Sequence, residues 1–459
     1  MPTPRDIAFQ TLLPWQRMYD PPFLPERTDA AWEGLSPRDR AFAFDLVTGV
    51  MRWRNTLDAV IQYPLRQPLD SLDHAVRVVL WIGAYQLLMQ SGTADYAAVD
   101  TTVELAKKQR STVKAAGLVN AVLRGITRLK PTRGARLAGR LGRNVFALDF
   151  ETDVTLSADV FPAVSAPDAH LAAVRSHPAI YVQHVRKIFG DVQAGEILLR
   201  NNVRPVVTLR VDAAAIDVPA NAGLAPHAEA KQFLVASEGW NPVIEDLVQR
   251  GVVSPQDPTS AKPVRALAEL AAAGKIREPG TILDLCAGLG TKAIQLARTF
   301  PGARITATDL DSQKTERLRK RAAQMGISNL SVVPMAEVAS GKPFDAVLLD
   351  VPCSNTGVMA KRVQSRWRWP SLGGEGFAAL KKLQSDLLAQ GSSLAGANGA
   401  VVYATCSIDP AENEMLVQEF IKGSTRKCGI VEQESTVPSL SNSAVGMRDG
   451  GHYTVIVAE

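Results

Sequence analysis

Two cysteines with similar surroundings are the residues best suited to do chemistry in this chain. Cys353 lies in LLDVPCSNTGV, just after an apolar run that ends at Asp350, and Cys406 lies in VVYATCSIDPAEN, at the end of another apolar run. A thiolate is a strong nucleophile, and a cysteine with the usual pKa of about 8.5 already supplies some thiolate near neutral pH. One such cysteine could simply be a buried core residue. Two of them, in loops of the same kind and beside a carboxylate, favour a reactive site.

Strands and helices that alternate from about residue 260 to the end must position these thiols. The expected strands are TILDLC (281–286), ARITATDL (303–310), FDAVLLD (344–350), AVVYATC (400–406) and the closing HYTVIVAE. This alternation predicts a parallel, doubly wound sheet. Loops at the carboxyl ends of such strands line the ligand crevice, so we expect both cysteines and Asp350 to converge there.

A glycine turn between a strand and a helix, in TILDLCAGLGTKA, is the candidate cofactor loop. Gly288 and Gly290 let the backbone approach a ligand, and the helix start offers free N–H groups. Asp309 ends the next strand, 19 residues after Gly290, at a spacing that suits a carboxylate on ribose hydroxyls. NAD binding remains an alternative, but Asp284 and the AGLG spacing fit the methyltransferase form of this loop better, and no hydride-transfer constellation follows.

The two thiols suit the methylation of a pyrimidine ring. Carbon 5 of cytosine is a poor nucleophile, and a thiolate that adds to carbon 6 turns the ring into an enamine-like species able to attack a sulfonium methyl group. Asp350 could hydrogen-bond ring nitrogen 3 and stabilise the charge that develops. A base must then remove the carbon 5 proton to release the enzyme, and Cys353 is the candidate.

The rest of the chain divides into further segments. Residues 1–130 repeat apolar positions at helical spacing without a strand pattern and predict an all-α domain. Residues 131–175 are expected to form a linker or insertion, and 176–255 a small α/β connecting module with a strand at 206–211. Residues 256–459 are then the catalytic domain.

Composition excludes several classes of protein. The four cysteines are scattered and form no CxxC pair, so neither a disulfide framework nor a metal site is expected; His74, His170 and His177 are expected to be structural. No run approaches the ~18 apolar residues of a membrane span, and the first residues do not resemble a signal peptide. A cytoplasmic protein is the expectation. The net charge of +5 permits a polyanionic partner without requiring one.

Together these motifs resemble the RsmB (Sun, Fmu) family of ribosomal RNA cytosine-C5 methyltransferases. VPCSNTG resembles the family's PC motif, ATCS its TC motif and QDPTSA (256–261) the entry to its catalytic domain. NNVRPVVTLRV is similar to the segment before that entry, and LVTGVMRW, GAYQLL and LVNAVLR are similar to the family's NusB-type domain. The resemblance covers nearly the whole chain except 131–170. It implies an all-α NusB-like N-terminal domain and an α/β Rossmann-like class I S-adenosylmethionine-dependent methyltransferase domain.

The resemblance also implies roles for residues. Cys406 would bond carbon 6, Cys353 would assist release, and Asp350 would face both cofactor and base, with Gln384 and Asn413 at positions where the family has polar residues. The implied S-adenosylmethionine-binding residues are Cys286, Ala287, Gly288, Leu289, Gly290, Thr291, Lys292, Asp309, Met335 and Asp350. The chain reads CAGLGTKA where the family has CAAPGGKT, and Met335 stands where the family has an acidic residue.

The expected function is methyl transfer from S-adenosylmethionine to carbon 5 of an unpaired RNA cytosine, in 16S rRNA, by a monomer. Two alternatives stay open: a catalytically impaired RNA-binding or ribosome-assembly factor, and a tRNA cytosine-C5 methyltransferase. RNA contacts are expected from KRVQSRWRW, in which arginine and tryptophan could neutralise phosphates and stack on bases. Weaker candidates are two basic groups, Arg38, Arg40, Arg52 and Arg54, and Lys107, Lys108 and Arg110.

Overall fold

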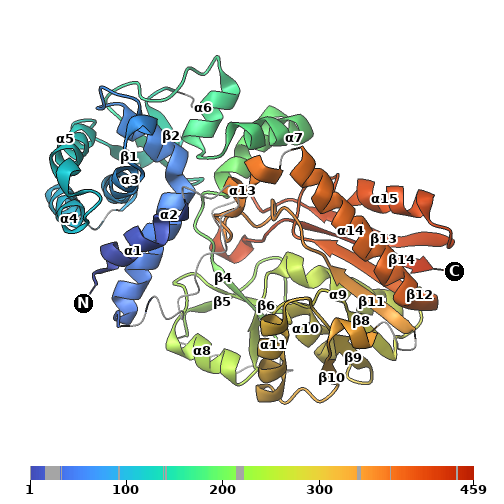
Figure 1. The fold of residues 1–459 in the computed structure, drawn as a ribbon. Helices are drawn as coiled ribbons and strands as arrows, with labels where there is room; N and C mark the ends of the chain where they lie inside the picture. The colour runs from blue at the N-terminus through green and yellow to red at the C-terminus, as the bar shows by residue number, and fades with distance from the viewer. Residues whose placement is uncertain are drawn as a thin grey trace. The chain divides into compact units, whose positions relative to one another are not determined.

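The computed structural model divides into two compact units. It describes residues 2–15, 32, 34–90, 92, 94–137, 139, 142–212, 222–338, 343–372, 374–440 and 443–458. The first unit is Met1–Arg204 with Met359–Ser371, and the second is Pro205–Val358 with Leu372–Glu459. Figure 1 draws the chain from its blue N-terminus to its red C-terminus.

Helices make up the first part of the first unit, as the apolar spacing predicts. They are α1 (Pro4–Leu12), α2 (Pro37–Gln62), α3 (His74–Met89), α4 (Asp95–Lys108) and α5 (Ala116–Thr127), with short 3-10 turns at Leu69–Ser71 and Val113–Ala115. Polar caps start several of them: the Ser36 side chain accepts from Asp39 N, and Asp73 accepts from Ala75 N. Helix α3 is buried over nearly its whole length and forms the centre of the core.

The described residues of 131–175, the segment expected to be a linker or an insertion, contain strands and a helix. Strands β1 (Thr132–Ala135), β2 (Val145–Ala147) and β3 (Thr152–Thr155) form an antiparallel sheet in the order β1-β3-β2, and α6 (Pro167–Val174) follows. Phe146 and Val154 belong to the same core as the five helices. Short strands interrupted by glycine and charged residues give little periodic signal, which explains why the sequence pattern missed them.

Helix α7 (Ala179–Arg200) completes the continuous part of the first unit and contains a break at Gly190, with φ 72° and ψ 170°. The expected connecting module is therefore divided: its helix belongs to the first unit and its strands to the second. These strands are β4 (Val207–Val211), β5 (Leu224–Pro226), β6 (Phe233–Ala236) and β7 (Val253–Pro255), in the order β5-β6-β4-β7 with α8 (Pro242–Gln249).

A seven-stranded sheet forms the centre of the second unit, in the order β10-β9-β8-β11-β12-β14-β13. The strands are β8 (Thr281–Asp284), β9 (Arg304–Ala307), β10 (Leu330–Val332), β11 (Phe344–Asp350), β12 (Ala395–Thr405), β13 (Cys428–Thr436) and β14 (Gly451–Ala458). The helices are α9 (Pro258–Ala272), α10 (Thr291–Thr299), α11 (Ser312–Gln324), α12 (Met335–Val338), α14 (Glu375–Leu394) and α15 (Glu414–Gly423).

The sheet is mixed, which corrects the expectation of a parallel one. Strands β8 to β12 pair in parallel, but β14 is antiparallel to both β12 and β13. The antiparallel pairing arises because β13 and β14 are consecutive strands with no crossover helix between them.

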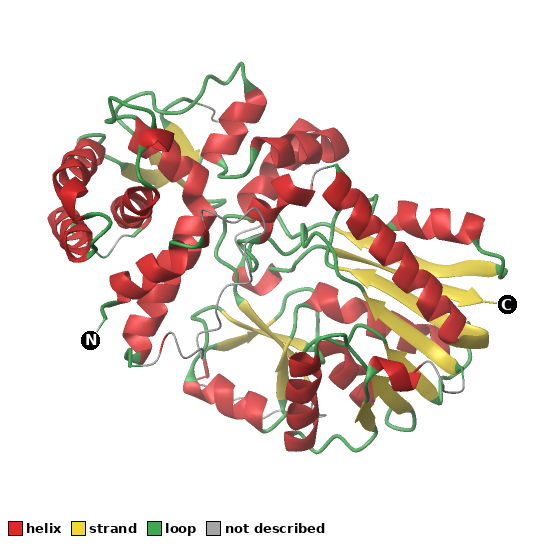
Figure 2. Ribbon diagram, in the orientation of Figure 1, coloured by secondary structure: helices red, strands yellow, loops and turns green. Residues whose placement is uncertain are grey.

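Both faces of this sheet are covered by helices, which Figure 2 shows in red around the yellow strands. Alternate residues of β11 enter different cores: Ala346 and Leu348 pack with α9 and α10, whereas Val347 and Leu349 pack with α14 and α15. The order of connections reverses between β8 and β11, and ligands of open α/β sheets bind at such a point. Among the described residues, no helix is long and apolar enough to span a membrane.

Candidate active site

The two cysteine side chains are in contact. Cys353 Sγ lies 3.1 Å from Cys406 Sγ, just beyond the carboxyl ends of β11 and β12. Asn355 holds both: its Oδ1 accepts from Cys406 Sγ at 3.2 Å, and its Nδ2 donates to the Cys353 carbonyl at 2.9 Å. Asn355 has φ 60°, a left-handed conformation that asparagine tolerates. The hydrogen bond that Cys353 donates to Cys406, together with burial, raises the pKa of Cys353 well above its ordinary value, so this thiol stays protonated beside its neighbour.

Asp350, the last residue of β11, is paired with Lys292. Lys292 Nζ lies 2.6 Å from Asp350 Oδ2 and 3.2 Å from Ser260 Oγ. Lys292 comes from the first turn of α10 and Ser260 from the first turn of α9. The contact therefore joins the glycine loop, the QDPTSA segment and the strand that leads to Cys353. Only 36% of the Asp350 side chain is exposed, which leaves one edge of a carboxylate available to a ligand.

The glycine loop has left-handed backbone conformations at both of its glycines, although its sequence differs from the family pattern. Gly288 and Gly290 both have positive φ, 54° and 83°, and a Cβ at Gly290 would lie 2.0 Å from Leu318 Cδ1. Thr291 is already the first residue of helix α10. It needs only helical angles, which a β-branched residue can adopt. The loss of a glycine at 291 therefore does not remove a required conformation.

Asp309 supports the loop from the neighbouring strand. Its Oδ2 accepts from the Gly288 amide at 2.8 Å, and its Oδ1 accepts from the Asp311 amide at 2.9 Å. Met335 lies just after β10, half-buried against the core that contains Val347 and Leu349. The structure thus places the expected cofactor residues at the carboxyl ends of β8, β9, β10 and β11.

Asp284, at the end of β8, provides a test of whether a cationic ligand fits here. It is 1% exposed, and no side chain among the described residues donates a hydrogen bond to either carboxylate oxygen. Burial, with the nearby Asp350 charge, raises its pKa to about 7, while Lys292 opposes the shift. A buried carboxylate without a partner is costly, and a positively charged ligand group would compensate it. S-adenosylmethionine carries a sulfonium and an ammonium group, so the residues present fit this cofactor. Burial also raises the pKa of Cys286, so this thiol stays protonated.

A buried carboxylate that the sequence reasoning missed links the two cysteine loops. Glu412 is fully buried and accepts hydrogen bonds from the residues that directly follow the cysteines, Ser354 and Ser407. Gln384, on α14, donates to Glu412 and to the Pro352 carbonyl, both at 2.9 Å. Asn413 donates to the Ser407 carbonyl at 3.0 Å. The signal lay in the segment PAEN, which places an acidic residue six positions after Cys406.

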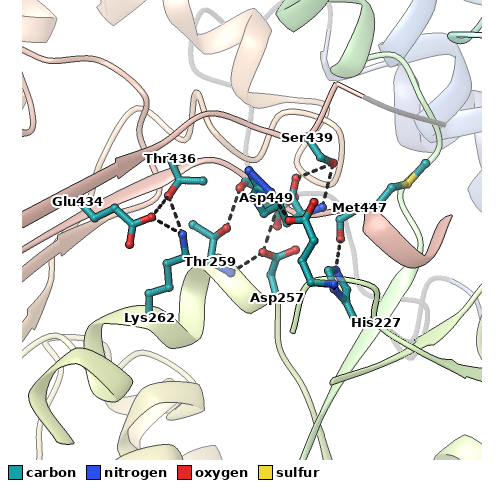
Figure 3. A network of polar contacts seen from close by, with 11 residues as sticks. His227, Asp257, Thr259, Lys262, Glu434, Thr436, Ser439, Met447 and Asp449 are labelled. Atoms are coloured by element: carbon teal, nitrogen blue, oxygen red, sulfur yellow. Dashed lines mark hydrogen bonds and ion pairs between the residues drawn. The ribbon is translucent and has the colours of Figure 1, made fainter. Parts of the chain in front are cut away.

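The loop between β13 and β14 supports the Cys406 backbone from behind. Gly357 N donates to the Cys406 carbonyl, and Gly450 N donates to the Gly357 carbonyl, each at 2.9 Å. A Cβ at Gly357 would lie 2.5 Å from the Gly450 oxygen, so glycine is required there. Figure 3 shows how this loop is fixed: Asp257 Oδ1 accepts from the Thr259 and Asp449 amides at 3.0 and 3.1 Å.

Further contacts in Figure 3 fix both sides of this loop. His227 Nε2 lies 3.1 Å from the Met447 carbonyl, and Lys262 Nζ donates to Glu434 at 2.6 Å and to Thr436 at 3.0 Å. Within QDPTSA, Asp257 and Thr259 bond the Asp449 backbone and so hold this loop, and the segment also begins α9.

Part of the expected RNA-binding segment is buried inside the first unit, which corrects that expectation. Arg366 is fully buried and donates to the carbonyls of Arg52, Ser176 and Asn201 and to Asn202 Oδ1, at 2.7–3.1 Å. Trp367 Nε1 donates to the Met51 carbonyl at 2.7 Å. Arg366 therefore satisfies the protein's own backbone and is not available to RNA, whereas Trp367 is half-buried with its ring nitrogen bonded to the backbone.

The basic group on α2 is divided in the same way. Arg52 is buried and donates to the Ala360 carbonyl at 2.8 Å, and Arg54 packs over the rings of Trp81 and Trp367. Arg38 and the basic residues at 107, 108 and 110 are exposed. Among the histidines, His170 and His177 contact backbone carbonyls. No group of potential metal ligands occurs among the described residues.

Comparison with known proteins identifies both halves of the chain. Residues 271–447 match the 16S rRNA methyltransferase RsmB/F family, and residues 2–128 match the NusB family. A putative methyltransferase of Mycobacterium tuberculosis is 30% identical over 433 residues, 92% of this chain and 86% of the relative. The ribosomal RNA small subunit methyltransferase B of Pseudomonas putida is 30% identical over 406 residues, 85% of this chain and 83% of the relative.

Solved structures support the fold. The crystal structure of PH0851 is similar with a TM-score of 0.70 and 18% identity, covering 99% of this chain and 98% of that one. A methyltransferase homolog from Pyrococcus horikoshii has a TM-score of 0.50 and 18% identity, covering 63% of this chain and 98% of its own. The sequence relatives, the family matches and the paired thiols agree: the chain belongs to the RsmB/F family of S-adenosylmethionine-dependent RNA cytosine-C5 methyltransferases, with a NusB-type N-terminal domain.

Proposed function

We propose that this enzyme methylates carbon 5 of an unpaired cytosine in 16S rRNA through a covalent bond between Cys406 and carbon 6. The observation that carries the proposal is the 3.1 Å contact between Cys353 Sγ and Cys406 Sγ. One ring placed beside both sulfurs would be within reach of a nucleophile and of a proton acceptor. The choice of 16S rRNA is supported by the relatives named as small-subunit methyltransferases.

The proposed steps use the residues at the strand ends. The Cys406 thiolate adds to carbon 6, so that the electron pair of the 5,6 double bond becomes available at carbon 5. S-adenosylmethionine, when bound, supplies the electrophilic methyl group. A proton shared between the Asp350 carboxyl group and ring nitrogen 3 stabilises the negative charge that addition places on the ring. Cys353, as thiolate, then takes the proton from carbon 5, the double bond re-forms and the bond to Cys406 breaks.

Coupling between the thiols suits this order of events. The hydrogen bond to Cys406 is the largest cause of the raised pKa of Cys353. Once Cys406 is bonded to carbon 6 that cause is removed, and Cys353 ionises more readily when a base is needed. Two such thiols titrate as a pair.

The cofactor would be held by the residues of the loop 286–292 with Asp309, Met335 and Asp350, and its positive charge would lie near Asp284. We propose RNA as the partner, with a single chain acting in the cytosol. The helical start of α10 at Thr291, the retained Gly290 and the positive φ of both loop glycines support an active enzyme over the impaired assembly factor.

Labelled-methyl transfer tests the proposal. Purified protein is incubated with radiolabelled S-adenosylmethionine and 16S rRNA or bulk tRNA, using wild type and Cys406→Ala. We expect label in 16S rRNA as 5-methylcytosine with wild type and none with the variant. Label found only in tRNA would show that tRNA and not 16S rRNA is the substrate. A wild-type protein that is inactive and binds no cofactor would overturn the proposed function.

A further inference from the structure

Glu412 joins the two cysteine loops by hydrogen bonds from both. Its Oε2 accepts from the Ser354 amide at 2.9 Å, and its Oε1 accepts from the Ser407 hydroxyl at 2.6 Å and from the Ser354 hydroxyl. Ser354 follows Cys353, and Ser407 follows Cys406. One carboxylate therefore accepts hydrogen bonds from the residue that directly follows each of the two cysteines.

Two other elements hold Glu412, one through its carboxylate and one through its backbone carbonyl. Gln384 on α14 donates to Oε2 at 2.9 Å, so four donors converge on Glu412. The Tyr403 hydroxyl, from β12, donates to the Glu412 carbonyl at 2.7 Å. A carboxylate can accept about four hydrogen bonds, so this one is saturated and has no free oxygen for a substrate. It therefore acts on the reaction through the loops.

Thr356 closes the connection between the loops. Its hydroxyl lies 2.9 Å from Ser407 Oγ and accepts from the Ile408 amide at 3.0 Å. Ser354, Thr356 and Ser407 are all buried. The side-chain oxygens of Glu412, Ser354, Thr356 and Ser407 all have hydrogen-bond partners. Buried polar groups satisfied in this way fix one geometry, here that of the two strand-end loops.

We propose that Glu412 is a positioning residue that holds the two cysteine loops together and keeps the thiols in contact. The proposal rests on the proposed function for its meaning in catalysis. Removing the carboxylate would let the loops separate, and a misplacement of about 1 Å in an active site can cost on the order of 10²-fold in rate. RNA binding would change little, because Glu412 touches no surface.

The charge of Glu412 can be tested through the pH dependence of Cys353 alkylation, which a residue with a purely structural role would not change. Two titratable groups, Cys406 and Glu412, raise the pKa of Cys353 together with burial, and the Cys406 hydrogen bond is the largest cause. In a Cys406→Ala background the Glu412 contribution remains. Glu412→Gln keeps the shape but removes the negative charge, so the alkylation of Cys353 should begin at lower pH.

The experiment therefore has two arms. In the first, iodoacetamide labelling of Cys353 is followed against pH by peptide mass spectrometry in Cys406→Ala, alone and with Glu412→Gln or Glu414→Gln. Glu414 is the matched control, since it contacts Ser435 and not the cysteine loops. In the second, kcat and KM for RNA are measured for each substitution in the wild-type background, with thermal unfolding to verify folding.

We expect Glu412→Gln to lower kcat at least about tenfold, to leave KM for RNA within about twofold and to move the alkylation midpoint to lower pH, whereas Glu414→Gln changes neither. Ser354→Ala, which keeps the carboxylate, should lower kcat less and leave the midpoint in place. If Glu412→Gln does not fold, the lower kcat expected for Ser354→Ala still tests the proposal. For Glu412→Gln, an unchanged kcat, or a lower kcat without a midpoint shift, overturns the proposal. Inactive wild type would refute the proposed function alone, since the alkylation arm needs no turnover.

Discussion

Asp284 should destabilise the unliganded enzyme in a pH-dependent way, and Asp284→Asn should remove that cost. The pKa of this carboxyl is raised from 3.8 to about 7 because it is buried and lies near the charge of Asp350. Below both values the folded and unfolded chains carry the same proton. As pH rises from about 4 to about 7 the unfolded chain ionises while the folded one does not, so stability falls; above about 7 the loss is constant.

The size of the effect follows from these values. One pKa unit corresponds to about 1.4 kcal/mol, so wild type should lose up to about 3 kcal/mol relative to Asp284→Asn between pH 5 and pH 8. The free-energy cost of burying the substituted amide without a partner is the same at pH 5 and pH 8, so it cancels when the two pH values are compared. For a domain of this size roughly 2–4 °C accompany each kcal/mol, so the gap in Tm should widen by roughly 5–10 °C.

Thermal unfolding of both proteins across pH 5–8, without ligand, measures this gap. Asp386→Asn is the control, because Asp386 is an exposed carboxylate on α14 paired with Lys382. The variant should also lose much of the Tm increase that S-adenosylmethionine gives wild type. A gap that stays constant with pH, or a wild type that gains stability relative to the variant toward pH 8, would show that Asp284 is not a buried carboxyl awaiting a cation.

Other predictions concern the cysteine pair, the buried arginine and the glycine loop. Diamide, which accepts two electrons and two protons, should join Cys353 to Cys406 as a disulfide, because the sulfurs lie 3.1 Å apart; mass mapping should find this pair, and dithiothreitol should restore activity. Arg366→Ala should cost about 3 kcal/mol or more of stability in chemical denaturation, since it leaves several buried acceptors unpaired, and Arg366→Lys should not restore it. Gly290→Ala should abolish measurable cofactor binding in calorimetry, because its Cβ would overlap Leu318 and its φ is 83°, while Gly274→Ala, at a positive φ far from any contact, should bind normally.

The strand-end chemistry could be predicted from sequence because periodic apolar runs mark where strands stop. Asp350, Cys353 and Cys406 follow such runs, and the structure brings the two sulfurs together. The helices of residues 1–130 were predictable because their apolar residues recur at helical spacing. The antiparallel β14 was not, because alternation of elements does not show which way the last strand runs.

Contacts between distant segments account for what the sequence did not reveal. Arg366 looks like a surface cation beside tryptophans, yet it is fully buried and donates to carbonyls from three other segments. Glu412 looks like a helix-start residue, and only its four donors reveal its place between the cysteine loops. Thr291 looks like a defect in a glycine loop until its position as the first residue of α10 is known.

The most direct test of the two-cysteine mechanism is a search for a covalent protein–RNA adduct. Cys353→Ala is incubated with S-adenosylmethionine and 16S rRNA, denatured, and resolved by gel electrophoresis with peptide mapping. We predict an adduct through Cys406 that carries a methylated cytosine, and none in Cys353→Ala/Cys406→Ala. The absence of any adduct from Cys353→Ala, with wild type active on the same RNA, would contradict the assigned roles of the two thiols.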